Sequence, residues 1–288
     1  MYEILIALRP WQWTKNLLIF VPFLLTSELI SREILSVGLV FLCFNLFVSS
    51  TYIFNDLKDA ELDKLHTEKK NRPIASGRLK ISTAKFIGLI LFFLSLGFSY
   101  LIDQKVSIYF ILYALITFSY TQYFKYIFLI DTLSVSFLFL VRIIIGGVTS
   151  DIVITPYLAS FIFLTSCLLS TSKKISILKS KILNLNSFSK LINVQDEKYS
   201  FLRIYSVFGL LSYSSFTIWL INLINTSSDN ENVIFLFISN IAYLIFIFIV
   251  YRFSISGELE DFSKELFKNK YLFFISLILV LTFFIGYF

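Results

Sequence analysis

Long runs of apolar residues dominate this sequence and restrict the folds that it can adopt. Hydrophobic residues make up 57% of its 288 residues and charged residues 15%, whereas a soluble domain carries about 25% charged residues. A helix needs about 20 apolar residues to cross the hydrocarbon of a bilayer. The sequence therefore predicts an all-α, polytopic membrane protein with nine membrane-spanning helices. The predicted spans are residues 17–30, 34–54, 86–102, 106–124, 127–149, 152–171, 204–224, 233–251 and 271–288.

The basic residues indicate how these spans are oriented. With a cytoplasmic N-terminus, almost all of the 25 Lys and Arg precede the first span or fall in cytoplasmic loops of about 55–85, 172–203 and 252–270. Cytoplasmic loops of membrane proteins carry such an excess of cations. We therefore expect a multi-pass protein of the inner (cytoplasmic) cell membrane, with its C-terminus on the opposite side.

The same loops limit the classes of function. The net charge of +6 is explained by topology, so it does not indicate a nucleic-acid partner. The two Cys and one His are too few for a disulfide framework or a zinc cluster. We read residues 1–288 as a single integral membrane domain whose aqueous chemistry uses the cytoplasmic loops, and a homo-oligomer is left open.

An acidic cluster follows directly after the predicted span 34–54. If the helix continues, Asp59 and Asp63 lie about 60° and about 20° around it from Asp56, and Asn55 lies about 100° away. Like charges so close repel one another. Mg²⁺ removes this conflict, because it takes one or two carboxylates and fills its shell with phosphate oxygens. The pattern predicts a diphosphate–Mg²⁺ site at Asn55, Asp56, Asp59 and Asp63, with a solvated acidic helix end as the alternative.

Cations follow this cluster in the same loop. Lys70 and Arg72 precede the turn-forming residues Pro73 and Gly77. Cations beside carboxylates that carry Mg²⁺ suit a phosphorylated substrate. A loop Lys also satisfies topology or attracts anionic lipid, so Arg72, held beside Pro73, is the stronger candidate.

Two charged residues fall within the predicted span 127–149. Intramembrane carboxylates are rare and usually functional, so Asp131 binds a second Mg²⁺ or the substrate sugar, unless it pairs with Lys125. Arg142 lies about three turns deeper, near the same helix face. An unpaired Arg at that depth is costly, so it pairs with a buried acid or meets an anionic substrate group.

Three further lysines lie on the predicted cytoplasmic side. Lys15 ends the N-terminal segment, and Lys173 and Lys174 end the sixth predicted span. Together they would form a cationic rim for a second anionic substrate.

These motifs resemble the UbiA-type intramembrane prenyltransferase superfamily, whose first aspartate motif is similar to Asn55–Asp63. The closest resemblance within it is to decaprenyl-phosphate phosphoribosyltransferases, over roughly residues 8–178. The superfamily's second motif has the form D-x-x-x-D, but Val135 stands four residues after Asp131, which fits the phosphoribosyl branch. The supporting stretches are residues 9–16, 71–77 and 120–125, Asp131, Arg142 before Gly146 and Gly147, and Lys173 with Lys174.

The resemblance implies a helical bundle with its active site at the cytoplasmic mouth. It implies a pentosyltransferase that moves 5-phosphoribose from phosphoribosyl pyrophosphate to a polyprenyl phosphate, with Mg²⁺, in cell wall biosynthesis. Asp56, Asp59 and Asp131 would serve catalysis. The substrate-binding residues would be Lys15, Lys70, Arg72, Tyr120, Lys125, Arg142, Lys173 and Lys174.

Two alternatives remain. A UbiA-type enzyme could instead move a prenyl group from a prenyl diphosphate to an aromatic or other lipid-soluble acceptor. A transporter would place charged sites at mid-membrane, often in two matching halves. The charges here gather at one mouth, and the sequence has no matching half, so the transporter is the weaker alternative.

Overall fold

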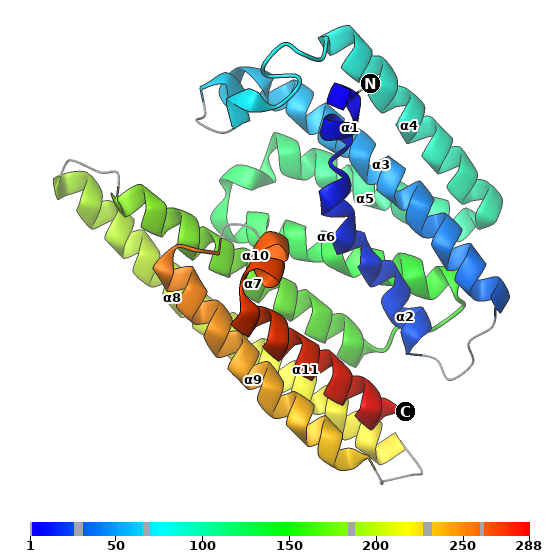
Figure 1. Cartoon of the computed structure of the whole chain (residues 1–288), viewed down its shortest axis with the longest axis vertical. Helices are drawn as coiled ribbons and strands as arrows, with labels where there is room; N and C mark the ends of the chain where they lie inside the picture. Colours follow the sequence, from blue (N-terminus) through cyan, green and yellow to red (C-terminus); the bar gives the residue numbers. More distant parts are fainter. Residues whose placement is uncertain (1, 26–30, 66–68, 184–187, 227–231, 260–261) are drawn as a thin grey trace. The chain divides into compact units, whose positions relative to one another are not determined.

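The computed structural model describes residues 2–25, 31–65, 69–183, 188–226, 232–259 and 262–288 (Figure 1). These residues are helical and contain no strand, which confirms the all-α prediction. The elements are α1 (Tyr2–Leu8), η1 (Pro10–Phe20), α2 (Val21–Leu24), α3 (Ser31–Lys64), η2 (Lys69–Asn71), α4 (Ile81–Ile102), α5 (Gln104–Gln122), η3 (Phe124–Tyr126), α6 (Phe128–Thr149), α7 (Pro156–Leu183), α8 (Phe188–Thr226), α9 (Val233–Ser256), α10 (Phe262–Lys268) and α11 (Lys270–Tyr287).

Seven helices in the described residues are long and apolar enough to cross a membrane: α3, α4, α6, α7, α8, α9 and α11. They coincide with seven of the nine predicted spans, and the protein is a multi-pass membrane protein. The predicted span 17–30 begins in the 3₁₀-helix η1, and its residues 26–30 lie outside the described part of the chain. The predicted span 106–124 corresponds to the helix α5, which is not among these seven. These two spans stay predictions.

Large apolar side chains lie exposed along these helices. On α4, for example, Phe93 is 64% exposed and Leu101 is 78% exposed. Soluble proteins rarely expose contiguous apolar surface of this kind. On a helix that crosses a bilayer, the same side chains face lipid tails.

Several helices extend beyond the predicted spans. The helix α3 continues from its apolar part through Asp63 to Lys64, as the acidic cluster required. The expected cytoplasmic loop 172–203 is largely helical, because α7 runs to Leu183 and α8 starts at Phe188. The sequence has no Gly or Pro between Pro156 and Gly209, so nothing in its composition breaks the helix where the apolar run ends.

The chain divides into two compact units. The N-terminal unit comprises Met1–Ser134 and Val141–Ile154, and the C-terminal unit comprises Val135–Leu140 and Thr155–Phe288. The prediction of one functional domain over residues 1–288 stays a prediction.

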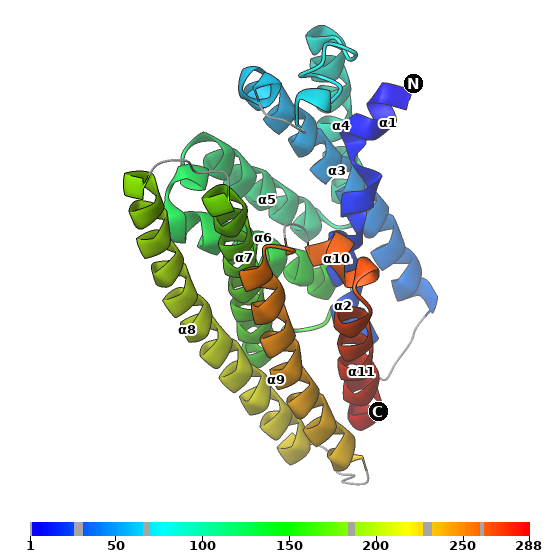
Figure 2. The ribbon, with the colours of Figure 1, turned by 60° about the vertical axis from the view of Figure 1, so that its left-hand side comes forward.

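In the N-terminal unit, α3 packs against α4, and α1 and η1 pack along α3 (Figures 1 and 2). Its aromatic core includes Phe44, which meets Phe110 and Tyr113 edge to face. Of its helical elements, η1 is unusual, because it spans 11 residues whereas 3₁₀ runs longer than three or four residues are uncommon.

In the C-terminal unit, α7 packs against α8 and α9, and α9 packs against α11 (Figure 2). An aromatic cluster fills its interior: Tyr243 contacts Phe161 and Phe216, and Trp219 contacts Phe283. Hydroxyl groups form the polar contacts there, such as Thr165 with Tyr243. This unit contains Lys173 and Lys174.

Candidate active site

The carboxylates of the acidic cluster emerge from the last three turns of α3. There is no Gly or Pro between Gly38 and Lys64, so the helix carries these side chains on a rigid element. Asp56 and Asp63 are buried, with 3% and 4% exposure. A buried carboxylate is costly unless it is paired, and each of the two has a cationic partner.

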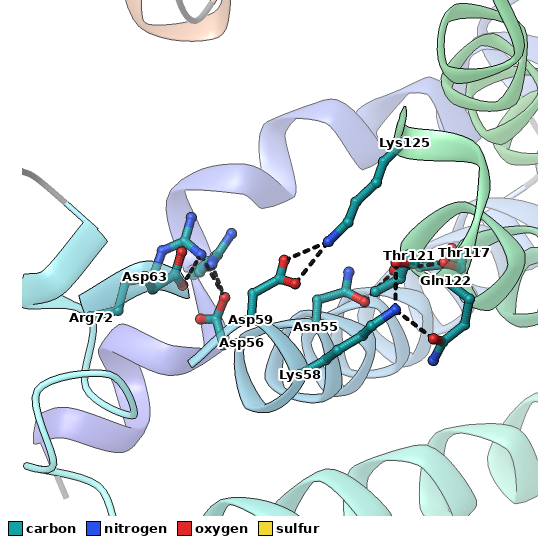
Figure 3. A network of polar contacts seen from close by, with 11 residues as sticks. Asn55, Asp56, Lys58, Asp59, Asp63, Arg72, Thr117, Thr121, Gln122 and Lys125 are labelled. Carbon is teal, nitrogen blue, oxygen red and sulfur yellow. Dashed lines mark hydrogen bonds and ion pairs between the residues drawn. The ribbon is translucent and has the colours of Figure 1, made fainter. Parts of the chain in front are cut away.

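Two guanidinium groups meet Asp56. Nη2 of Arg9 lies 2.5 Å from Oδ1 of Asp56, and Nη1 of Arg72 lies 3.0 Å from the same oxygen. The same Nη1 lies 2.7 Å from Oδ2 of Asp63 (Figure 3). A single nitrogen of Arg72 therefore bridges two carboxylates that are two helical turns apart.

Asp59 points toward the chain that follows α5. Nζ of Lys125, in η3, lies 2.7 and 3.1 Å from the two carboxylate oxygens of Asp59 (Figure 3). Asn55 takes part in the same junction, because its Oδ1 accepts a hydrogen bond from Thr121 at 2.6 Å. Lys58 donates to the carbonyl of Thr121 and to the side chain of Gln122, at 2.8 and 2.5 Å.

Local packing brings Arg72 to the carboxylates. Residues 69–79 form consecutive turns in which Ser76 N donates to the Arg72 carbonyl and Leu79 N donates to the Pro73 carbonyl. Gly77 has a φ of 77°, which favours glycine. The apolar side chains of these turns are buried against α1, α3 and α4. This cluster contains Ala7, Ile53, Ala60, Ile74, Leu79 and Ala84.

Arg9 is a site residue that the sequence did not assign. It follows α1 and precedes Pro10, and its guanidinium carbon lies 5.1 Å from the ring centroid of Tyr52. The signal that pointed to it was the run Arg9-Pro10-Trp11-Gln12-Trp13, which contributed to the family resemblance. Sequence alone could not show that a residue 47 positions away contacts Asp56.

Asp131 lies in the first turn of α6, as predicted. Tyr120, near the end of α5, has its hydroxyl within hydrogen-bonding reach of the Asp131 carboxylate. Both residues belong to the N-terminal unit that holds the carboxylates of α3. The structure thus joins Asp131 to Tyr120, a partner that the sequence named only through the family motif.

Arg142 is buried deep in the N-terminal unit, at 4% exposure. Its Nε donates to Oδ1 of Asn16 at 2.7 Å, and its Nη2 donates to the hydroxyl of Tyr113 at 2.9 Å. Asn16 in turn donates to Asn45 at 2.7 Å. The contacts of this guanidinium include neutral oxygens and the rings of Phe44 and Tyr113.

The other predicted cations lie in different surroundings. Lys70 is exposed on η2, and Lys15 is half-buried on η1. Lys173 is exposed and Lys174 is half-buried on α7, within the C-terminal unit. Their predicted contacts with substrates stay predictions.

The residues of α3 fit a magnesium ion by their chemistry. Asn55, Asp56, Asp59 and Asp63 offer the oxygen ligands that Mg²⁺ prefers, and Mg²⁺ needs only one or two protein carboxylates. A cationic nitrogen already lies between Asp56 and Asp63, so a cation there contacts both. In the described part of the chain, no group of three or more His, Cys, Asp or Glu is arranged to hold a metal. A site with two carboxylates, completed by substrate oxygens, therefore fits best.

Comparison with known proteins supports the resemblance. The model of the UbiA prenyltransferase family matches residues 17–278. The chain belongs to the UbiA prenyltransferase family. It is 33% identical, over 156 residues, to decaprenyl-phosphate phosphoribosyltransferase of Corynebacterium glutamicum, which covers 52% of this chain and 47% of that protein. The recognition of the family from sequence motifs is thus confirmed.

Two further comparisons extend this result. An uncharacterized protein of Sinorhizobium fredii, y4nM, is 36% identical over 155 residues, which cover 54% of this chain and 30% of that protein. The chain thus aligns with half or less of the length of these two curated relatives. The structure of a UbiA homolog from Archaeoglobus fulgidus bound to DMAPP and Mg²⁺ superposes with a TM-score of 0.71 at 17% identity, over 99% of this chain and 97% of that one. That likeness establishes the UbiA fold.

Proposed function

We propose that this UbiA-family transferase moves 5-phosphoribose from phosphoribosyl pyrophosphate to a polyprenyl phosphate of the decaprenyl-phosphate type, releasing pyrophosphate. The observation that carries the proposal is the pairing of the α3 carboxylates with guanidinium and ammonium groups. Asp56 with Arg72, and Asp59 with Lys125, put acidic and basic groups together at one helix end. The relative from Corynebacterium glutamicum, named decaprenyl-phosphate phosphoribosyltransferase, supports this choice of substrates.

In this mechanism the pyrophosphate end of the donor meets α3. Mg²⁺, held by carboxylates from Asp56, Asp59 and Asp63 with Asn55 beside them, would stabilise the charge that develops on the leaving pyrophosphate. Arg72 and Lys125 would donate to phosphate oxygens, since charge-assisted hydrogen bonds to phosphate are strong. The bond from C1 of the ribose to pyrophosphate breaks, and C1 gains positive character that the neighbouring anions stabilise.

The acceptor supplies its own nucleophile. A phosphate oxygen of the polyprenyl phosphate is already anionic at neutral pH, so it forms the new bond to C1 without a general base. We propose that Lys15, Lys173 and Lys174 meet this phosphate. Arg142, which also donates to Asn16 and Tyr113, is a further candidate for this contact.

Asp131 and Tyr120 would bind the sugar. A carboxylate that accepts a hydrogen bond from a phenol can also accept one from a ribose hydroxyl. Asp131 binding a second Mg²⁺ is the alternative. Lys70, exposed beside Arg72 in sequence, would attract the polyanionic donor.

The same proposal includes an orientation. From the distribution of Lys and Arg we propose that the N-terminus and the end of α3 lie in the cytoplasm and the C-terminus on the opposite side of the inner membrane. Phosphoribosyl pyrophosphate then enters from the cytoplasm. Its acceptor stays in the bilayer, where cell wall precursors are assembled on polyprenyl carriers.

A prenyl transfer reaction is the second candidate. The matching family is described as prenyltransferases, and the Archaeoglobus fulgidus homolog was solved with DMAPP and Mg²⁺. In this reaction a prenyl diphosphate takes the place of the donor, and an aromatic or other lipid-soluble molecule takes the place of the acceptor. The lack of a second acid at Val135, four residues after Asp131, favours the phosphoribosyl reaction.

An assay with two labelled donors separates the two candidates. Purified protein in lipid is given labelled phosphoribosyl pyrophosphate with decaprenyl phosphate, or a labelled prenyl diphosphate with an aromatic acceptor, each with Mg²⁺ or with a chelator. We expect Mg²⁺-dependent label in the lipid phase from phosphoribosyl pyrophosphate. Label transferred only from the prenyl diphosphate would select the second candidate.

A further inference from the structure

Residues 9–16, here called the docking segment, run antiparallel to α3 and contact it at three points. Asn16 donates to Asn45 at 2.7 Å, and Nε1 of Trp13 donates to Ser49 at 3.1 Å. Arg9 pairs with Asp56. The partners on α3 are four and seven residues apart, a spacing that places them on one helix face. A stripe of polar side chains on α3 therefore aligns the segment, and the stripe ends at the acidic cluster.

The far end of the docking segment is fixed in the interior. Asn16 and Asn45 are 1% and 0% exposed, and Asn16 also accepts from Arg142. Breaking such a buried network leaves polar groups without partners, which is costly. Ser49 also holds the chain before this segment, because its hydroxyl donates a hydrogen bond to the carbonyl of Leu8 at 2.8 Å. These contacts fix the position of the residue that follows Leu8.

That residue, Arg9, has a strained backbone. Its φ of 53° and ψ of 58° lie in the left-handed region, which residues other than Gly, Asn and Asp rarely adopt. Strain of this kind persists only where the surroundings over-determine it, and it concentrates at functional sites. A glycine would satisfy the backbone at this position at lower cost. The presence of Arg therefore points to a use for its side chain.

The guanidinium groups of Arg9 and Arg72 together balance the charges of Asp56 and Asp63, and Mg²⁺ bound to these carboxylates would leave Arg9 available for a phosphate. Oδ1 of Asp56 also accepts from Arg72, so two cations share one oxygen. The Arg9 side chain is 20% exposed, whereas that of Asp56 is 4% exposed, so Arg9 lies on the open side of the pair. Its hydrogen bond to Asp56 uses Nη2, and a guanidinium carries five N–H donors in all.

Resting on the function proposed above, we propose that Arg9 is a further binding residue for the pyrophosphate end of the donor and that the docking segment positions it. A guanidinium matches the oxygens of a phosphate in a bidentate manner. When pyrophosphate lies at the acidic cluster, Arg9 donates to it beside Arg72. Trp13, Asn16 and Arg142 act on the donor only through the position of Arg9.

The test separates binding from folding. Inorganic pyrophosphate with Mg²⁺ is titrated into purified protein in detergent by calorimetry, and the melting temperature of each variant is measured. Arg9→Gly removes the cation and relieves the strain. We expect its melting temperature to fall, because buried Asp56 loses a cationic partner, and pyrophosphate binding to weaken at least about tenfold, the effect of losing a hydrogen bond between charged groups. Arg9→Lys should recover part of the affinity.

Two further variants sharpen the result. Asp151→Gly is the matched control, because Asp151 has the same φ of 53° and is exposed after α6. It should leave pyrophosphate binding unchanged. Trp13→Phe keeps an aromatic ring and loses the hydrogen bond to Ser49, so it should weaken binding less than Arg9→Gly does.

The outcomes distinguish this inference from the proposed function. If wild-type protein does not bind pyrophosphate with Mg²⁺, the proposed function itself fails. If wild-type protein binds and Arg9→Gly binds equally well, the inference on Arg9 is overturned and the proposed function stands. A loss of binding in Trp13→Phe as large as that in Arg9→Gly also overturns it, because Arg9 would then serve only the fold.

Discussion

Lys125 holds Asp59 with its ammonium nitrogen 2.7 and 3.1 Å from the two carboxylate oxygens. The pair joins the end of α3 to η3, the turn between α5 and α6. Its side chains are 18% and 26% exposed, and a partly buried charge pair is screened less by salt than one at the surface. Asp59 therefore has its own cation, separate from the guanidinium groups that meet Asp56.

Replacing Lys125 tests whether this cation serves the donor. Lys125→Met keeps the length of the side chain and removes its charge. We expect the KM for phosphoribosyl pyrophosphate to rise roughly tenfold, because a charge-assisted hydrogen bond to phosphate is lost. The KM for the acceptor should stay within twofold in the same steady-state assay.

Lys58→Met is the matched control for Lys125→Met. Lys58 also joins α3 to the end of α5, but it donates to Thr121 and Gln122, which are uncharged. We expect a modest loss of thermal stability and an unchanged KM for the donor. Equal effects of the two variants on that KM would mean that Lys125 acts only as a structural link.

The carboxylates themselves should be indispensable. In Asp56→Asn or Asp59→Asn we expect transfer activity to fall at least about a hundredfold, since changes even to the outer partners of metal ligands often cost ten- to a hundredfold. Both proteins should still insert in the membrane and elute as monodisperse particles. Near-normal turnover in either variant would remove that residue from the metal site.

Replacing Lys173 tests the proposed contact between this lysine and the acceptor phosphate. Lys173→Ala removes an exposed cation on α7, and we expect a several-fold rise in the KM for polyprenyl phosphate with little change in the KM for the donor. Lys85→Ala, another exposed lysine in a predicted cytoplasmic segment, is the control. An unchanged acceptor KM in Lys173→Ala would assign this lysine to membrane topology alone.

Short sequence patterns correctly predicted those parts of the fold that depend only on residues close in sequence. The apolar run before Asn55 and the absence of Gly or Pro after it predicted that α3 would carry Asp56, Asp59 and Asp63 on one helix, as it does. The motif N-D-x-x-D-x-x-x-D, with its neighbours, also led to the correct family. Both inferences rest on residues that are close in sequence.

These local patterns could not predict contacts between segments that are distant in sequence. Apolar composition predicted a span from Leu17, but it could not show that the polar residues of η1 meet α3. The partner of Arg142 was expected to be a buried acid or a substrate. The partners that the structure gives it include Asn16, 126 residues away, and Tyr113, neither of which the sequence predicted. Such pairings depend on how helices pack, which hydropathy does not encode.

The docking segment depends on a close approach at Gly146. A Cβ added to Gly146 of α6 would collide with the backbone carbonyl oxygen of Ile19 in η1. We therefore expect Gly146→Ala to destabilise the protein by about 1–3 kcal/mol, the usual cost of overpacking. Thermal unfolding in detergent, followed by tryptophan fluorescence, measures this loss.

Gly97→Ala provides the comparison, because a Cβ at Gly97 of α4 meets no atom within 4 Å. Alanine in a helix interior is favoured over glycine by roughly 0.5–1 kcal/mol, so this variant should keep or gain stability. Limited trypsin digestion adds a local readout, since cleavage after Lys15 requires η1 to detach from α3. We expect faster cleavage at Lys15 in Gly146→Ala than in Gly97→Ala. Equal cleavage rates together with equal melting temperatures would show that the approach of Ile19 to Gly146 does not hold the docking segment.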